Sequence, residues 1–474
     1  SSRSSAVLPA GGAPVRVAGG KWTPEPGVYA AKTVLLVDGA GVDEITHEFR
    51  VTEYGEADPS EVVQVKDGHF YLGGEKWHAL GMNYWPRYST GLESPDWSRW
   101  ASPEQYNPEI VEQDLALAKK LGLNTLSVQY MRADQARAMM DFAERCRAHG
   151  IKLHVFIPGL HPLDQNFASA RALIEAAHLP QSPAMFAYDV GWEVHVGRYE
   201  QRRAYDRNWH DWVVDQYGSI EAAERAWGYS PAREDGVITG PADDQLMTDG
   251  EWRVFVAAYR RFWDDEISKR YREVREFIRS LDRHRLVCAR SGYGGTGAKW
   301  VADRFPFDLA SGAKHLDFTS PEAYGIAGDR ANFIHGGFTT EYGRFVSGGK
   351  PVFWAEYGMS VWPQCDEATL ERQRELYEDT LRMMRESYAN GSAGWWWPGG
   401  FRVGENSDYG VVNPDATPRP AALEIAAFSA GFTPADVPRR DILVTIDRDD
   451  HVTGYAGVYA AARDEYVKAV ESGL

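Results

Sequence analysis

Two glutamates lie where apolar segments of the sequence end, and they are the residues best placed to do chemistry. Glu193 ends the segment MFAYDVGWE, and Glu356 follows the apolar run in KPVFWAEYG. A carboxylate at the end of a buried strand is costly unless it is paired or used. An ion pair with an arginine would explain either glutamate alone, but two of them beside tryptophans indicate a functional pair.

Two carboxyl groups that face each other suit the cleavage of a glycosidic bond. One group, kept protonated by an apolar setting and by its neighbour's charge, donates a proton to the leaving oxygen. The other attacks the anomeric carbon, which requires about 5–5.5 Å between the two groups. The sequence therefore predicts Glu193 and Glu356 as catalytic residues, with Glu193, beside Trp192, as the protonated partner.

Other patterns give weaker signals. His154 and His161 lack the additional ligands that a metal needs, so we interpret them as hydrogen-bonding histidines and expect neither a metal nor a cofactor. The glycine-rich segment 291–297 lacks the Lys-Ser/Thr ending of a phosphate-binding loop and predicts a flexible loop. No serine lies in a Gly-x-Ser-x-Gly motif, which argues against an acyl hydrolase.

The elements that must position the two glutamates alternate between strand and helix. An open doubly wound sheet rarely needs eight such units in series, whereas a (β/α)8 TIM barrel has that number. In such a barrel the active site lies at the C-terminal ends of the strands, and Glu193 and Glu356 end strands four and seven. The predicted strands span residues 78–86, 124–130, 151–159, 185–193, 285–290, 316–324, 351–358 and 392–397.

The helices have recognisable boundaries in the sequence. Asn107-Pro108 predicts a cap followed by a first-turn proline, and Gly150 ends another helical pattern. The interval between strands four and five is the longest, so residues 194–250 are expected to be an insertion at the C-terminal face, followed by a long helix over 251–281.

The barrel is predicted to span residues 65–438 and to be flanked by two smaller segments. Residues 1–64 comprise a tail and a partial β-sandwich-like segment, in which two alternating runs flank an Asp38-Gly39 hairpin turn. Residues 439–474 start a C-terminal α/β segment, with a strand over 441–447 and a helix near 457–471. One strand and one helix are too small for a core, so this segment is expected either to be incomplete or to pack onto the barrel.

Composition limits the class of protein and of partner. An apolar share of 43% excludes disorder as the main state, and no apolar run is long enough to span a membrane. The net charge of −17 argues against nucleic acid and anionic membranes as partners. The 17 tryptophans favour a sugar ligand, an oligosaccharide or polysaccharide. The oligomeric state is not indicated, and the sandwich-like segment slightly favours an extracellular or periplasmic location.

Several motifs resemble the clan A glycoside hydrolases, which include families 5, 42, 39 and 2. The resemblance covers about residues 65–430 and is most evident in KDGHFYLGGEKWHALGMNYW, KPVFWAEYG, SAGWWWPGG, SDYGVVNPDATPRPA and the inserted WVVDQYGSIEAAERAWGY. It implies Glu193 as the acid/base, Glu356 as the nucleophile and Tyr324 as a hydrogen-bond donor to the nucleophile. Trp395 or Trp397 would stack on the sugar, because both are expected on one face of strand eight, and Asn83 and Trp192 are further substrate-binding candidates.

Three positions depart from the clan pattern. Trp192 stands where clan members have an Asn that bonds the sugar's 2-hydroxyl, and Ser127 and Gln129 stand where several families have an Arg. Glu322-Ala323-Tyr324 replaces His-x-Tyr on strand six. The missing Asn favours a sugar with a different 2-position, such as mannose, or a bond from another strand.

The sequence thus predicts a retaining β-glycoside hydrolase that acts on a β-mannoside, or on a β-glucoside or β-galactoside. A transglycosylase would use the same site and the same glycosyl-enzyme. A non-catalytic carbohydrate-binding barrel is the other alternative, motivated by the missing Asn.

Overall fold

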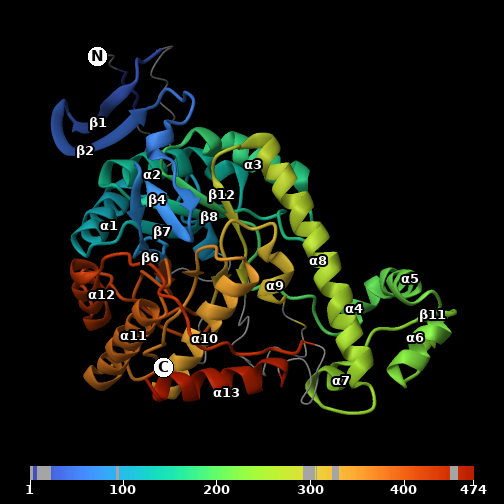
Figure 1. Ribbon diagram of the computed structural model, residues 1–474. Helices are drawn as coiled ribbons and strands as arrows, with labels where there is room; N and C mark the ends of the chain where they lie inside the picture. The colour runs from blue at the N-terminus through green and yellow to red at the C-terminus, as the bar shows by residue number, and fades with distance from the viewer. Residues whose placement is uncertain are drawn as a thin grey trace. The chain divides into compact units, whose positions relative to one another are not determined.

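The computed structural model describes residues 4–7, 23–91, 96–291, 305, 307–322, 330–448 and 457–473. The chain divides into two compact units, residues 1–55 and 56–474 (Figure 1). The second unit contains both predicted catalytic glutamates and every other predicted site residue.

The first unit is a β-hairpin, as the sequence predicts. Its strands β1 (Gly27–Val37) and β2 (Ala40–Val51) pair antiparallel. Asp38 (φ 52°) and Gly39 (φ 82°) form the turn, in left-handed conformations that an Asp-Gly pair tolerates. Most side chains of the hairpin are exposed. Its membership of a β-sandwich stays a prediction.

Parallel strands of the second unit form a closed barrel, which confirms the (β/α)8 prediction. Seven of them form one sheet in the order β12-β9-β8-β7-β6-β16-β15. β13 continues from β12 and pairs with β14, and a bridge from Thr319 to Val352 links β14 to β15 and closes the circle. The strands are β6 (Ala79–Asn83), β7 (Thr125–Gln129), β8 (Lys152–Phe156), β9 (Met185–Asp189), β12 (Leu286–Cys288), β13 (Arg290–Ser291), β14 (Ser320–Pro321), β15 (Phe353–Trp354) and β16 (Gly391–Gly394).

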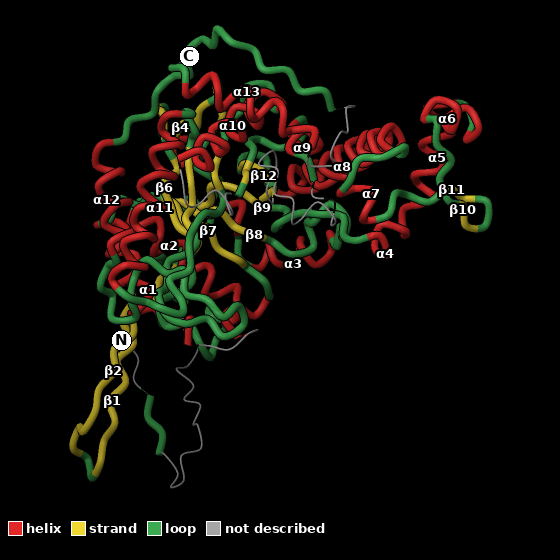
Figure 2. The backbone as a smooth tube through the Cα atoms, turned by 90° about the horizontal axis from the view of Figure 1, so that it is seen from below, coloured by secondary structure: helices red, strands yellow, loops and turns green. Residues whose placement is uncertain are grey.

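Helices surround the strands (Figure 2). The first begins where the sequence predicts, because the Asn107 side chain accepts a hydrogen bond from the Ile110 amide at 3.0 Å. Gly150, with φ 73°, ends the second. None of the helices in the described chain is both long and apolar enough to cross a membrane. The helices outside the insertion are α1 (Pro108–Lys120), α2 (Ala136–His149), α3 (Phe167–Ala176), α8 (Arg253–Leu281), α9 (Leu309–Ala313), α10 (Arg330–Val346), α11 (Glu367–Glu386), α12 (Pro420–Gly431) and α13 (Gly457–Glu471).

An apolar layer fills the N-terminal end of the barrel. The short strands β3 (Gln64–Lys66), β4 (His69–Leu72) and β5 (Glu75–Trp77) form an antiparallel sheet beside it. Phe70 of β4 packs edge-on against Phe186 and Phe318, with 5.2 Å between ring centroids in each case. Phe353 completes the cluster. Since this end is filled, chemistry with a ligand belongs at the C-terminal end of the strands.

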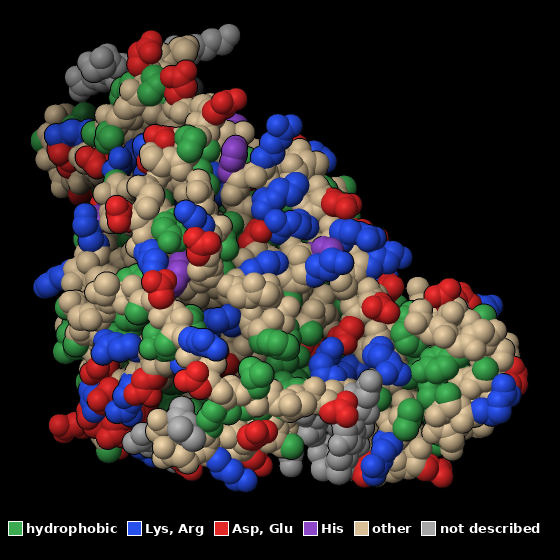
Figure 3. Space-filling model, in the orientation of Figure 1, with side chains coloured by type: hydrophobic (Ala, Val, Ile, Leu, Met, Phe, Trp, Pro, Cys, Tyr) green, Lys and Arg blue, Asp and Glu red, His purple; other side chains and the backbone are tan. Residues whose placement is uncertain are grey.

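Residues 194–250, which the sequence predicts to be an insertion, contain several short elements that pack on α8. The insertion contains α4 (Tyr199–Arg202), α5 (Asp206–Tyr217), α6 (Ile220–Trp227), β10 (Arg233–Glu234), β11 (Val237–Ile238) and α7 (Asp243–Met247). Trp209 of α5 stacks on Trp227 at 5.7 Å and contacts Phe255 of α8 at 6.0 Å. Despite the negative net charge, Lys and Arg side chains gather over α8 (Figure 3).

The C-terminal segment packs against the barrel helices. Tyr459 and Ala462 of α13 are buried in a cluster with α10. The strand predicted at 441–447 is wrong, because these residues form irregular chain in the structure. Val444 and Ile446 are half-buried against the same cluster, while Leu443 is 88% exposed. The alternating pattern therefore reflects packing on helices from one side and not pairing in a sheet.

Candidate active site

Three glutamates meet at the C-terminal ends of the barrel strands. Glu322 and Glu356 follow β14 and β15 and face each other in a parallel β-bridge. Glu193 follows β9, with a left-handed φ of 46°. One carboxyl oxygen from each of the three lies within 4.8 Å of the other two. The structure thus brings the predicted pair together and adds a third carboxyl group that the sequence analysis did not assign to the site.

The three glutamates differ in their access to solvent. Glu193 is exposed, whereas Glu356 is 2% exposed and Glu322 is fully buried. A group that takes protons from water must reach solvent, but a carboxylate that attacks a bound sugar need not. The exposures therefore match different tasks for Glu193 and Glu356.

Arg290 of β13 binds Glu356 in a buried network. Its Nη1 donates to Glu356 Oε1 and, at 2.9 Å, to Asn83 Oδ1. Its Nε donates to Asp189 Oδ2 at 3.1 Å, and its Nη2 donates to Ser127 Oγ at 2.7 Å. The guanidinium thus fixes the orientation of Glu356 and, as an adjacent positive charge, favours its ionised form. Ser127, which departs from the clan pattern on strand two, thus accepts a hydrogen bond from an arginine of strand five.

Trp192 covers the same guanidinium. The Cζ atom of Arg290 lies 3.6 Å from the centroid of the Trp192 ring, a close cation–π contact. Trp192 also packs edge-on against Trp395 at 5.8 Å and against Phe156 at 5.5 Å. The residue that replaces the clan's Asn therefore contacts the arginine that binds Glu356. Its contact with a substrate stays a prediction.

Asn83 of β6 is also part of this network. Its Nδ2 donates to the carbonyl oxygens of Ala355 at 2.8 Å and Ala393 at 3.1 Å, and its side chain is buried. The amide ties β6 to the neighbourhood of β15 and β16. This favours a positioning role over the predicted substrate contact, which stays a prediction.

Glu322 stands out because neither of its carboxyl oxygens has a hydrogen-bond partner among the described residues. Burial, followed by the charges of Glu356 and Glu193, raises the pKa of Glu322 well above its usual range, against the opposite effect of Arg290. The raised pKa favours the neutral, protonated form of this carboxyl group.

The prediction that Trp395 and Trp397 share a face is wrong. β16 ends at Gly394, so strand alternation does not extend to these residues. Trp395 instead stacks on Trp396 at 5.4 Å between centroids, and both contact Trp85. Trp397 is fully buried beside Tyr84. Of the two predicted stacking residues, Trp395 is the one that contacts Trp192, which covers Arg290.

His154 and His161 both form hydrogen bonds. The His154 ring lies 3.0 Å from Ser127 Oγ and 2.9 Å from Cys288 Sγ, and burial, with the charge of Arg290, lowers its pKa well below the usual range. His161 Nδ1 accepts from the Leu163 amide at 3.1 Å. Tyr324 and segment 292–297 of the predicted glycine-rich loop lie outside the described residues.

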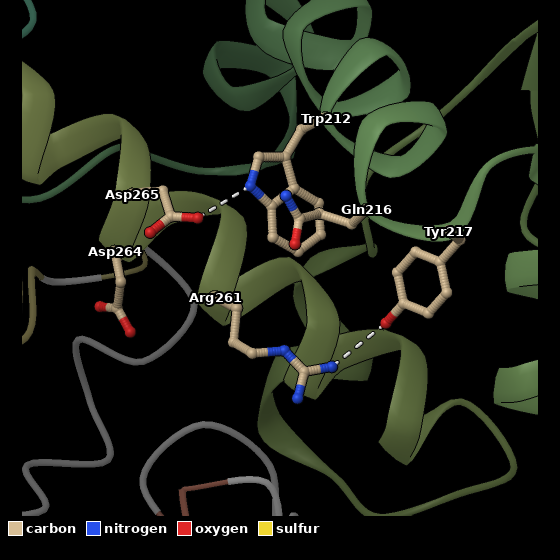
Figure 4. Close-up of a pocket in the computed structure, with 6 residues that line it drawn as sticks. All are labelled: Trp212, Gln216, Tyr217, Arg261, Asp264 and Asp265. Carbon is tan, nitrogen blue, oxygen red and sulfur yellow. Dashed lines mark hydrogen bonds between the residues drawn. The ribbon is translucent and has the colours of Figure 1, made fainter.

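A hollow of about 410 Å³ lies between α5 and α8, on the insertion (Figure 4). Four of its six lining side chains form two pairs with one another. Trp212 Nε1 donates to Asp265 at 2.9 Å, and Arg261 donates to the Tyr217 hydroxyl at 3.2 Å. These contacts fix the insertion on α8, and the hollow's lining does not overlap the three glutamates.

The chain is similar in structure to several glycosidases. It superposes on a GH5_18 enzyme from Streptomyces cattleya in complex with Manb1-4GlcNAc, with a TM-score of 0.54, 14% identity and coverage of 84% of this chain and 92% of that one. For an exo-β-agarase the TM-score is 0.56, the identity 13%, and the coverage 80% and 65%. At these identities the likeness shows the fold.

A larger protein matches at a lower score. A GH2 β-galacturonidase from Eisenbergiella tayi matches at a TM-score of 0.48 and 15% identity, over 86% of this chain but only 59% of that one. This chain therefore spans less than two thirds of that enzyme's length. No curated protein matches the sequence.

A family model gives the firmest assignment. The model of glycoside hydrolase family 42, described as beta-galactosidase, matches residues 154–419, a range that includes Glu193, Arg290, Glu322 and Glu356. The match covers more than half of the 474 residues. Because the match covers more than half of the chain, the protein belongs to glycoside hydrolase family 42.

Proposed function

We propose that the protein is a retaining β-glycosidase in which Glu356 is the nucleophile and Glu193 the acid/base. The observation that supports this most is the approach of their carboxyl oxygens to within 4.8 Å. A retaining pair has about 5–5.5 Å between carboxyl groups, whereas an inverting pair needs about 6.5–9.5 Å to admit a water. The separation favours direct attack by a carboxylate.

In the first step, a carboxylate oxygen of Glu356 attacks the anomeric carbon of the bound sugar. The bond from this carbon to the leaving oxygen breaks, and the oxygen keeps the electron pair and takes the proton of Glu193. The ion pair with Arg290 supports this assignment, because it orients the Glu356 carboxylate before the substrate binds.

In the second step, the ionised Glu193 takes a proton from a water molecule. The water oxygen bonds to the anomeric carbon while the ester bond to Glu356 breaks, and the product keeps the β configuration. The exposure of Glu193 supports this role, since the attacking water must reach it from solvent.

The proposed substrate is a β-linked hexoside, and two observations favour particular sugars. The family description favours a β-galactoside. The replacement of the clan's Asn by Trp192 favours a β-mannoside. Rates with the aryl β-galactoside, β-mannoside and β-glucoside decide between them, and a tenfold preference corresponds to about 1.4 kcal/mol in the barrier.

Azide rescue tests the two assigned roles. Glu193→Ala removes the acid/base, so the first step survives only with an activated aryl glycoside and the second step becomes slow. Azide is already an anion, so it can attack the glycosyl-enzyme without a general base. Added azide should therefore raise turnover at least tenfold and give a β-glycosyl azide. Glu276→Ala, at an exposed glutamate of α8, is the control and should behave like the wild type. An α-azide, or no rescue, would contradict the assignment.

A further inference from the structure

Three carboxyl oxygens within 4.8 Å of one another define a small triangle. Sides at the upper limit of 4.8 Å place the centre of the triangle about 2.8 Å from each corner, which is a hydrogen-bond distance for oxygen. One corner belongs to Glu322, whose two oxygens have no partner among the described residues although the side chain is fully buried. Such a group is costly unless a ligand completes its hydrogen bonds.

The substrate has one oxygen suited to this place. Glu356 and Glu193 act on the anomeric carbon and on its leaving oxygen, so the third carboxyl group faces substituents one bond away. These are the ring oxygen and the 2-hydroxyl. A proton donor at the ring oxygen would oppose the positive charge that the ring develops in the transition state, whereas a hydroxyl can both accept and donate.

We propose that Glu322 binds the 2-hydroxyl of the sugar and thereby performs, from strand six, the task of the Asn that Trp192 has replaced. This inference rests on the proposed glycosidase function. The neutral acid donates its O–H to the 2-hydroxyl oxygen, and the 2-hydroxyl donates to the carboxylate of Glu356. Glu322 keeps its proton throughout, so no proton transfer enters the reaction.

The surroundings of Glu322 explain why it donates. The groups that act on its charge are Glu356 after β15, Glu193 and Asp189 at the end of β9, and Arg290 of β13. Arg290 forms ion pairs with Asp189 and Glu356, so its positive charge is already balanced by two carboxylates and stabilises an ionised Glu322 less. The donor is lost when Glu322 ionises, so turnover should fall on the alkaline side of the pH profile.

The test compares an aryl β-glycoside with its 2-deoxy analogue in the wild-type protein, Glu322→Leu and Glu322→Gln. Removing the 2-hydroxyl should lower wild-type kcat/KM about 30-fold, in the range of a hydrogen bond to a charged network. Glu322→Leu should show a similar loss with the parent glycoside and little further loss with the analogue. Glu322→Gln, whose amide both donates and accepts, should stay within about fivefold of wild type.

Thr319→Val is the matched control. Thr319 precedes Glu322 on the same strand, is buried, and its hydroxyl also has no partner among the described residues. In this variant, removing the 2-hydroxyl of the substrate should lower kcat/KM by the same factor as in the wild type. Melting temperatures of all variants show whether a loss reflects folding.

Two results would overturn the inference. Equal losses for both substrates in Glu322→Leu would make Glu322 merely structural. A wild-type preference for a 2-amino-2-deoxy glycoside that Glu322→Gln abolishes would make it an anion that binds a cationic sugar. If the wild type turned over neither glycoside, the proposed function would fail, and calorimetric binding of the methyl glycoside and its 2-deoxy analogue would still test the contact.

Discussion

Both ends of the barrel contain buried side chains, but these side chains are chemically opposite. On three strands, a phenylalanine near the closed end is followed, three or four residues later, by an acid at the open end. Each side chain is at most 2% exposed. The pairs are Phe186 and Asp189, Phe318 and Glu322, and Phe353 and Glu356.

This difference shows how one set of strands provides both stability and chemistry. The phenylalanines pack on one another, and burying them is favourable. The acids gain nothing from burial unless they are paired, and Arg290 pairs only Asp189 and Glu356. We infer that the aromatic end stabilises a barrel whose other end contains costly groups.

Glu356→Gln should have the largest effect on the open end. A neutral amide cannot form the glycosyl-enzyme, so kcat should fall at least about 10⁴-fold, or ~5.5 kcal/mol, with good and poor leaving groups alike. Steady-state rates with two aryl glycosides measure this. Near-full activity of the variant would contradict the assignment.

Phe186→Ala should have the opposite effect to Glu356→Gln, because it should lower stability and leave catalysis unchanged. Phe186 stacks on Phe318 at 5.4 Å and contacts Phe70 and Phe353, so its removal should lower the free energy of unfolding by about 3–5 kcal/mol. Denaturant titration measures this loss, while kcat per folded molecule should stay within twofold. A large loss of kcat in the folded variant would show that the two ends are not separable.

Arg290→Lys should weaken the pairing at the open end. Lysine keeps the charge but cannot bind Asp189, Asn83, Ser127 and Glu356 together, so kcat/KM should fall about 100-fold, or ~2.7 kcal/mol. The control is Arg145→Lys on α2, a buried arginine paired with Glu112 and Asp141, which should leave kcat/KM unchanged. Equal losses in both variants would indicate a general cost of losing a buried arginine.

Glu322→Gln should give the smallest effect, visible in the pH dependence of stability. The folded state raises the pKa of Glu322 above its ordinary value of 4.5, so the unfolded chain loses this proton first as pH rises. Wild-type stability should fall above pH 4.5 until the folded group also ionises, and the glutamine variant should lack this contribution. As the pH is raised from 4 to 8, the melting temperature of the wild type should therefore fall relative to that of the variant. A difference independent of pH would contradict the neutral form.

Much of this arrangement follows from the sequence by one rule. A charged residue that ends an apolar strand must be paired or used, and this identified Glu193 and Glu356. The same rule applies to Arg290 at the end of RLVCAR, which the sequence analysis did not single out. Glu322 was harder to find, because Ser320 and Pro321 interrupt the apolar pattern before it.

Other features depend on contacts that no local pattern reveals. The faces of Trp395 and Trp397 could not be predicted because β16 ends at Gly394. The pattern of residues 441–447 is that of a strand, but the segment packs on α10 and α13. The network of Arg290 joins its own strand to four others, so only the closed barrel brings its partners together.

The configuration of the first product tests the central claim, that Glu193 and Glu356 are a retaining pair, most directly. Proton NMR during turnover of an aryl β-glycoside by the wild-type protein distinguishes the anomers before mutarotation mixes them. The account predicts that the β-hemiacetal forms first and the α-anomer appears only later. An α-anomer formed first would mean inversion and would contradict the assignment of Glu356 as nucleophile.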